Sequence, residues 1–231
     1  MSSHNFKHSL FTQFAFVGKA LSNGNRLELL EFLAQGQRSV EDLANVSGLT
    51  IGNTSQHLKL LRQAGLVTSK KVGLKVFYRL KGNNVVELYD ALRKVAEQNV
   101  AEVALLVNTY LKTKDKLEPV SRRDLVSRVA DGLVTIIDVR PPEEYRAGHI
   151  AGAINIPLDD LESGLESDLG RQLSKLDKHS EIIAYCRGPH CILAFDAVEK
   201  LRKKGLKVRR LEDGYPEWKV AGLPVEQINQ P

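Results

Sequence analysis

The two cysteines of this 231-residue chain, Cys186 and Cys191, lie five residues apart on one short segment. The segment reads Cys186-Arg187-Gly188-Pro189-His190-Cys191. A thiolate is the nucleophilic form of cysteine, and a cationic neighbour such as Arg187 lowers the pKa of a thiol. We therefore expect Cys186 to be a reactive thiolate and Arg187 to assist it.

Each residue around Cys186 leaves two interpretations open. Cys191 is either a resolving thiol, which turns an oxidised Cys186 into a bridge, or a small residue that fills the start of a helix. The presence of both cysteines on one loop favours the resolving thiol. His190 and Gly188 either contact a substrate or only shape the loop. Cys186 itself could be an inert, buried cysteine at a strand end.

The cysteine segment follows an apolar strand and precedes a helix, so backbone N–H groups and the positive end of the helix would face Cys186. Beyond residue 120, strand-like and helical stretches alternate, which predicts an α/β fold with a parallel sheet covered on both faces. The expected strands are 133–139, 153–156, 181–185 and 206–210, and the expected helices are 122–130, 143–147, 158–161, 192–203 and 216–220.

The first 82 residues predict short helices followed by a hairpin, which is the order of a mainly α winged helix-turn-helix. Helices are expected at 10–21 and 26–33, and Ser39 with Asp42 resembles a capping pair that opens a third helix. Thr50 is a good N-cap for a fourth helix that runs to Ala64 and stops at Gly65. Strands 66–69 and 76–80 then flank a basic turn.

The fourth helix and the hairpin carry the side chains that could bind DNA. Polar side chains on such a helix reach base edges, while lysines on a wing meet phosphates. The predicted DNA-binding residues are Asn53, Ser55, Gln56, His57, Lys59, Arg62, Lys70, Lys71 and Lys75.

The positive charge of the chain is confined to its first third. The formal net charge is +5, but residues 1–82 carry 11 Lys+Arg against 4 Asp+Glu, and residues 83–118 and 119–231 are each −1. A basic module next to two nearly neutral segments indicates double-stranded DNA as the partner of the first third only.

Residues 83–111 predict one long apolar-striped helix, which the small N-terminal module cannot cover. We expect a homodimer that uses this helix and the N-terminal helix. The predicted domains are 1–112 for DNA binding and dimerisation, a linker at 113–119, and an α/β domain at 120–231.

Several classes of protein are excluded by composition. With 42% hydrophobic and 26% charged residues the chain is globular, and no apolar run is long enough to span a membrane. The N-terminus is not a convincing secretory signal, and two cysteines make no disulfide framework, so we expect a cytoplasmic protein. No cofactor is predicted.

The basic module resembles the ArsR/SmtB repressors. The resemblance rests on residues 27–33, on 39–44 and above all on 53–67, Asn-Thr-Ser-Gln-His-Leu-Lys-Leu-Leu-Arg-Gln-Ala-Gly-Leu-Val. It implies a homodimer that reads a two-fold operator. Metal-sensing members carry cysteines before the turn or histidines on the long helix, and this chain has neither, so no metal site is predicted.

The second half resembles a rhodanese domain. The resemblance rests on residues 137–157, which include Asp138, Arg140 and His149, and on 211–218 followed by 221–225. It implies that Cys186 takes a sulfane sulfur from a small donor, namely thiosulfate, a persulfide or a polysulfide. Asp138 and Arg140 are expected to pair, and His149 to fix a loop. Cysteine phosphatases need an arginine at position 192, where this chain has isoleucine.

Together these features predict a transcriptional repressor whose operator affinity responds to reactive sulfur or redox chemistry at Cys186. The alternative is a sulfurtransferase that passes sulfur through Cys186 without regulatory switching. A third hypothesis is a domain that only binds a partner protein or an oxyanion.

Overall fold

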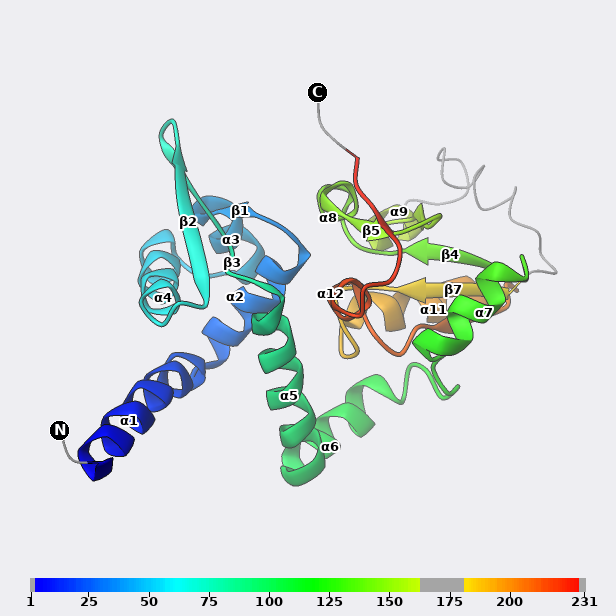
Figure 1. Cartoon of the computed structure of the whole chain (residues 1–231). Coiled ribbons are helices and arrows are strands. Elements are labelled where there is room, and N and C mark those ends of the chain that lie inside the picture. The colour runs from blue at the N-terminus through cyan, green and yellow to red at the C-terminus, as the bar shows by residue number, and fades with distance from the viewer. Residues whose placement is uncertain (1–2, 163–180, 229–231) are drawn as a thin grey trace. The chain divides into compact units, whose positions relative to one another are not determined.

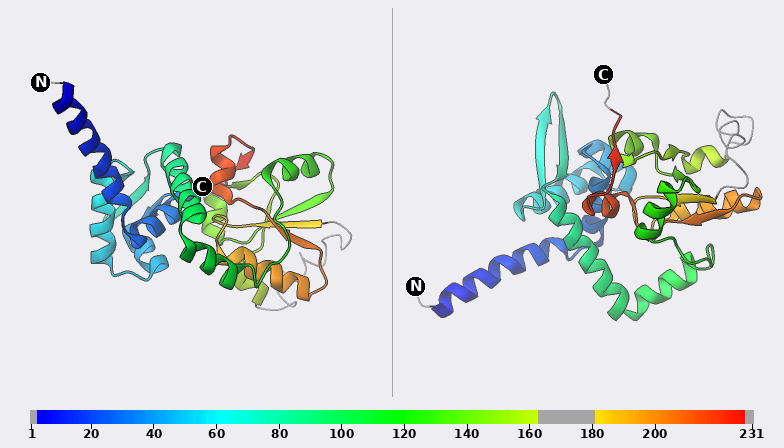
Figure 2. Two further views of the ribbon diagram at one scale, coloured as in Figure 1. Left: turned by 90° about the horizontal axis from the view of Figure 1, so that it is seen from below. Right: turned by 45° about the vertical axis from the view of Figure 1, so that its right-hand side comes forward.

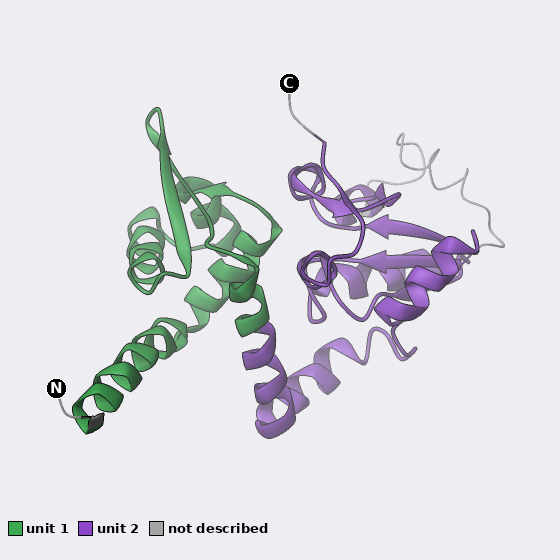
Figure 3. Ribbon diagram, in the orientation of Figure 1, with its two compact units in different colours: residues 1–89 green, residues 90–231 purple. Residues whose placement is uncertain are grey.

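The computed structural model describes residues 3–162 and 181–228. The chain forms two compact units, residues 1–89 and 90–231 (Figure 3). The division falls within a helix, so the boundaries expected at 112 and 120 stay a prediction. Part of the expected domain 120–231 lies outside the described residues. Among those that are described, no helix is both long and apolar enough to cross a bilayer.

The first unit consists of helices α1 to α4 and the start of α5, packed around a small sheet of three strands. Its elements are α1 (Ser3–Leu21), α2 (Gly24–Gln35), β1 (Arg38–Ser39), α3 (Val40–Ser47), α4 (Ile51–Gln63), β2 (Val67–Val72), β3 (Lys75–Leu80) and the start of α5 (Asn83–Asn99). β3 pairs antiparallel with both β1 and β2. Leu29, Leu43, Leu58 and Leu61 are fully buried between the helices. The winged helix-turn-helix is thus confirmed, with α1 beginning at Ser3 rather than at residue 10.

The predicted helix caps are confirmed. The Ser39 hydroxyl accepts a hydrogen bond from the N–H of Asp42, and the Asp42 carboxylate accepts one from the N–H of Ser39. The Thr50 hydroxyl accepts a bond from the N–H of Asn53 at the start of α4. Gly65 has a φ of 73°, the left-handed conformation that ends a helix.

The single helix expected over 83–111 is wrong, because the helix is broken at Val100. α5 ends at Asn99, α6 covers Ala101–Leu106, and a π-helical turn covers Val107–Leu111. The Val100 backbone is extended, with φ −109° and ψ 107°. The Asn99 side chain donates a hydrogen bond to the Val95 carbonyl, a local bond that competes with continuation of the helix.

The second unit is built on a parallel sheet, as predicted. Its order is β6 (Ile154–Asn155), β4 (Val134–Asp138), β7 (Glu181–Tyr185) and β8 (Val208–Arg210). A separate antiparallel pair joins β5 (His149–Ile150) to β9 (Val225–Glu226). Beyond residue 120, the helices in the described part of the chain are α7 (Arg122–Ala130), α8 (Pro142–Ala147), α9 (Leu158–Glu162), α11 (Ile192–Lys203) and α12 (Tyr215–Val220).

Helices cover both faces of this sheet. One core contains Ile137 and Ile182 of the strands with residues of α9 and α11, and the other contains Ile136 and Ile183 with residues of α7 and α12. The left view of Figure 2 shows α12 (red) and α11 (orange) on opposite sides of β7 (yellow), and Figure 1 labels the elements. The alternating pattern of the sequence arises because each strand is buried on both sides.

Candidate functional site

The cysteine loop lies where the carboxyl end of β7 meets the start of α11. Cys186 follows the last residue of β7, and Cys191 is the N-cap residue of α11. The Cys186 carbonyl accepts a hydrogen bond from the N–H of Tyr215, and the Gly188 carbonyl accepts one from the N–H of Cys191. β7 has neighbours on both sides, so the loop sits at the carboxyl edge of a parallel sheet, where α/β folds place their sites.

Cys186 and Cys191 are joined by a disulfide, with their Cα atoms 6.2 Å apart. This separation lies within the usual range for disulfides. The side chains are 1% and 9% exposed and form part of the core between the sheet and α11. Neither cysteine of the chain is free in this state. The bridge ties the end of a central strand to the first turn of a helix.

Arg187 is held by a carboxylate that sequence reasoning missed. Its Nε lies 3.0 Å from both oxygens of Glu144, and its Nη2 lies 2.7 Å from Oε1. The Glu144 side chain is 1% exposed and the Arg187 side chain 16%, so this is a partly buried, two-pronged ion pair. Arg187 therefore fixes the loop to α8, and its charge is largely neutralised in the bridged state. Its assistance to a thiolate stays a prediction.

Gly188 lies against the backbone of Gly214. A Cβ at position 214 would lie 2.4 Å from the Gly188 nitrogen and 2.4 Å from the Arg187 carbonyl carbon. Only a residue without a side chain allows this approach. The segment before α12 is thus in close backbone contact with the cysteine loop.

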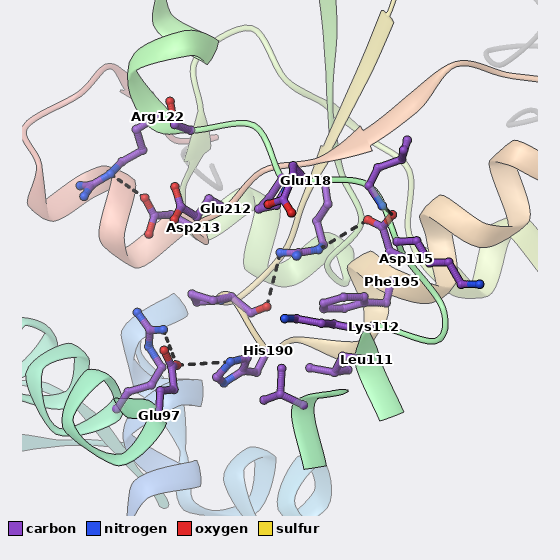
Figure 4. Close-up of a pocket in the computed structure, with 18 of the residues that line it drawn as sticks. Glu97, Leu111, Lys112, Asp115, Glu118, Arg122, His190, Phe195, Glu212 and Asp213 are labelled. Atoms are coloured by element: carbon purple, nitrogen blue, oxygen red, sulfur yellow. Dashed lines mark hydrogen bonds and ion pairs between the residues drawn. The ribbon is translucent and has the colours of Figure 1, made fainter. Parts of the chain in front are cut away.

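His190 connects the loop to α5 within the second unit. Its Nε2 lies 3.2 Å from Oε1 of Glu97, which also accepts a 2.7 Å bond from Arg93 (Figure 4). Burial lowers the pKa of His190, and the Glu97 carboxylate opposes this effect. Sequence reasoning missed Glu97, because nothing local marks a contact between residues this far apart in the chain.

A fully buried polar network underlies the loop. Arg140 Nη2 donates to Asp138 at 2.6 Å and to the Gly148 carbonyl at 2.7 Å, and the Tyr185 hydroxyl donates to Asp138 at 2.6 Å. Burial and the Asp138 charge raise the pKa of Tyr185. The expected Asp138–Arg140 pair is present, and His149 is bonded to the Tyr145 carbonyl at 2.9 Å. The network fixes the strand that leads into Cys186.

α4 presents the predicted DNA-binding side chains on one face. Thr54, Leu58 and Leu61 are buried, and the opposite face is exposed. Of the predicted residues on this helix, the exposed ones are Asn53, Ser55, Gln56, Lys59 and Arg62. Two members of the predicted set are less free to reach DNA: His57 is half-buried, and Arg62 has a partner inside the unit.

His57 is half-buried, and its Nδ1 is enclosed. Burial, with the charge of Arg26, lowers the pKa of His57. Arg62 donates to the Ser69 hydroxyl at 3.0 Å and so links α4 to β2. Both side chains therefore help to shape the unit, and their contact with DNA stays a prediction.

The hairpin separates its lysines between two faces. Lys70 pairs with Phe77, and Lys75 pairs with Val72, which places both lysines on the face that also carries Arg79. Lys71 points to the other face. Lys70 and Arg79 line a recess of about 370 Å³ together with Gln37, Thr68, Ser69 and Phe77. Sequence reasoning missed Arg79, although the period-two pattern of the strand places it opposite Thr68.

No group of three or more His, Cys, Asp or Glu side chains is gathered in a ligand-like cluster in residues 3–162 and 181–228.

The two units define a DNA-binding regulator joined to a rhodanese-like domain. Residues 23–69 match the family described as "Bacterial regulatory protein, arsR family", and residues 121–221 match the "Rhodanese-like domain" family. The chain is 42% identical, over 96% of its length and 93% of the relative, to the HTH-type transcriptional regulator Rv0324 of Mycobacterium tuberculosis. It therefore belongs to the ArsR-family transcriptional regulators that carry a rhodanese domain.

Further similarities concern single units. The homodimeric winged helix-turn-helix domain Mb0332 of Mycobacterium bovis is 38% identical, with a TM-score of 0.40, over 43% of this chain and 91% of that one. The rhodanese-related protein of Thermoplasma volcanium is 27% identical, with a TM-score of 0.39, over 49% of this chain and 100% of that one.

Proposed function

We propose that this regulator binds its operator with an affinity set by the sulfur chemistry of Cys186 and Cys191. The observation that carries the proposal is that the two cysteines of the chain are bonded to each other across a loop whose His190 contacts α5. A change at the cysteines alters the loop, and α5 leads from the loop back to the DNA-binding unit. The proposed sensing loop therefore contacts the same helix, α5, that begins in the DNA-binding unit.

The proposed chemistry balances with a persulfide as donor. The Cys186 thiolate attacks the outer sulfur of RSSH, forms Cys186 persulfide and releases RSH. The Cys191 thiolate then attacks the Cys186 sulfur, forms the disulfide and releases hydrogen sulfide. Two thiols of the protein are oxidised, and the persulfide is reduced. The 6.2 Å separation of the Cα atoms supports the second step, because it lies in the bonding range.

The bridge can shift operator affinity only if it favours one geometry of the regulator over another. Cys191 occupies the N-cap position of α11, and His190 pairs with Glu97 of α5, so opening the bridge removes a restraint on both helices. We expect the reduced form to bind the operator and the bridged form to release it.

The test is operator binding by fluorescence anisotropy, with wild type and Cys186→Ser, each before and after polysulfide treatment. We expect at least a fivefold loss of affinity in treated wild type, reversal by a thiol reductant, and no change in Cys186→Ser. Identical affinities in all four samples would falsify the proposal. Thiocyanate formation from thiosulfate and cyanide, measured on the same samples, distinguishes the sulfurtransferase alternative: rapid turnover without an operator response favours the enzyme.

We also propose a homodimer. Four of the seven phenylalanines of the chain, Phe6, Phe11, Phe14 and Phe16, are 46–59% exposed along α1. On α5, Leu88, Leu92 and Val95 are 38–58% exposed. Apolar faces of this kind are covered by a partner in soluble proteins. Sedimentation should give a dimer, and Phe11→Ser with Phe14→Ser should weaken it, whereas a monomeric wild type contradicts the proposal.

A further inference from the structure

A cavity of about 890 Å³ lies within the second unit, on the side of the cysteine loop that faces α5 and the π-helical turn (Figure 4). Pro189 and His190 of the loop line it, and so do residues of the segment that runs from Val107 to Arg123. Its volume is in the range of sites for small molecules. The cysteines themselves do not line it.

The wall of the cavity is more cationic than anionic. Seven lysines and arginines line it against five aspartates and glutamates. Three of the carboxylates are already engaged: Asp115 with Arg202 at 2.8 Å, Asp213 with Arg122 at 2.6 Å, and Glu97 with Arg93 at 2.7 Å.

Among the other charged side chains of the wall, the lysines and arginines with no ion-pair partner across residues 3–162 and 181–228 form a cationic patch. Glu118 and Glu212 are exposed. Lys112, Lys116 and Arg123 form no ion pair with any residue in the described ranges. Figure 4 shows the Lys112 side chain alongside Phe195, with its amino end directed into the cavity.

The Arg210 side chain is largely buried, and no carboxylate of the described residues lies close enough to neutralise its positive charge fully. Its side chain is 12% exposed, and its Nε makes no hydrogen bond within the described part of the chain. The nearest carboxylate oxygen, Oδ2 of Asp115, is 3.9 Å from Nε, while Nη1 reaches the carbonyls of Leu211 and Pro189 at 3.2 and 3.5 Å. Burial lowers the pKa of Arg210, a sign that its charge lacks full compensation.

Apolar groups complete the wall. The Arg210 guanidinium lies 4.1 Å from the centre of the Phe195 ring, and Leu111, Val107 and Leu117 also line the cavity. A guanidinium held on an aromatic ring presents its edge to a ligand, and that edge matches the two oxygens of a carboxylate or phosphate.

We infer that this cavity binds a small organic anion, with its carboxylate or phosphate against Arg210 and Lys112 and its apolar part against Phe195 and Leu111. The site does not depend on sulfur chemistry, since neither cysteine lines it. Because Pro189 and His190 form one wall, an occupant touches the cysteine loop and can act as a second effector of the regulator.

The test is isothermal titration calorimetry of the full-length protein at constant ionic strength. The probes are citrate for the carboxylate class, glucose 6-phosphate for the phosphate class, and inorganic phosphate for a bare anion. We expect citrate or glucose 6-phosphate to bind wild type and Cys186→Ser alike. Lys112→Gln and Arg210→Gln should each weaken binding about tenfold, the cost of one charge-assisted contact.

Lys204→Gln is the matched control, because Lys204 is an exposed lysine outside the cavity wall. Lys112 is exposed as well, so its replacement leaves the fold intact even if Arg210→Gln unfolds the unit. The inference is overturned if neither organic anion binds at millimolar concentration. It is equally overturned if Lys112→Gln binds the anion as wild type does.

Discussion

Replacing Glu217 with glutamine should stabilise the second unit at alkaline pH and flatten its pH dependence. Glu217 lies in the first turn of α12, where its Oε2 accepts a 3.0 Å hydrogen bond from the N–H of Gly214. Burial, with a smaller contribution from the Asp213 charge, raises the pKa of Glu217 from 4.5 to about 7. The folded chain therefore holds this proton more tightly than the unfolded chain.

The sign and size of the effect follow from that difference. Below pH 4.5 the carboxyl is protonated in both states and costs nothing. As the pH rises towards about 7, only the unfolded chain can ionise freely, so stability falls. The shift corresponds to about 3 kcal/mol, complete above the folded pKa. Glutamine keeps an oxygen for the Gly214 N–H and carries no charge, so Glu217→Gln should be about 3 kcal/mol more stable than wild type at pH 8.

The assay is urea denaturation between pH 4.5 and 8, followed by the fluorescence of Trp218, the one tryptophan of the chain. Trp218 is 3% exposed and belongs to the core of the second unit, so its signal reports that unit. Glu143→Gln, an exposed glutamate on α8, is the control and should follow wild type. A wild-type pH slope in Glu217→Gln would show that the Glu217 carboxyl does not cause the loss of stability at high pH.

Three further outcomes are expected. Asp138→Asn leaves the Arg140 guanidinium, which is 0% exposed, without its charge partner and should cost about 3–5 kcal/mol in the same denaturation assay; a loss under about 1 kcal/mol contradicts a buried ion pair. Thr50→Ala removes the N-cap bond of α4 and should destabilise the first unit by about 1 kcal/mol, measured by thermal denaturation followed by circular dichroism; an unchanged midpoint argues against the cap. Lys70→Gln should reduce the slope of log operator affinity against log salt by about 0.9, while the exposed Lys19→Gln leaves it unchanged; equal slopes would remove Lys70 from the interface.

Local signals in the sequence predicted most of the fold. The Ser39–Asp42 capping pair, the stop at Gly65 and the hairpin each depend on residues within a few positions of one another. The parallel sheet followed from strands that are apolar on both sides. The pairing of Asp138 with Arg140 was predictable for the same reason, because the two residues are neighbours on one strand end.

The contacts that give the site its character were not predictable, because they join distant parts of the chain. Glu144 meets Arg187 across 43 positions, and either of the neighbouring glutamates of α8 could have been the partner. The break at Val100 escaped prediction because the apolar spacing continues on both sides of it. The spacing along the chain favoured a bridge between Cys186 and Cys191 without deciding it, and only the fold places His190 against Glu97.

The close approach of Gly214 to the cysteine loop has a consequence for the natural variation of this protein. A methyl group at position 214 would lie within 2.4 Å of backbone atoms on both Arg187 and Gly188, so the loop would have to move before alanine could be accepted. The two segments are 26 or more positions apart in the printed sequence, yet they can change only together. A relative with a bulkier residue at this position should also carry a cysteine loop of another length or shape, even where both cysteines are retained.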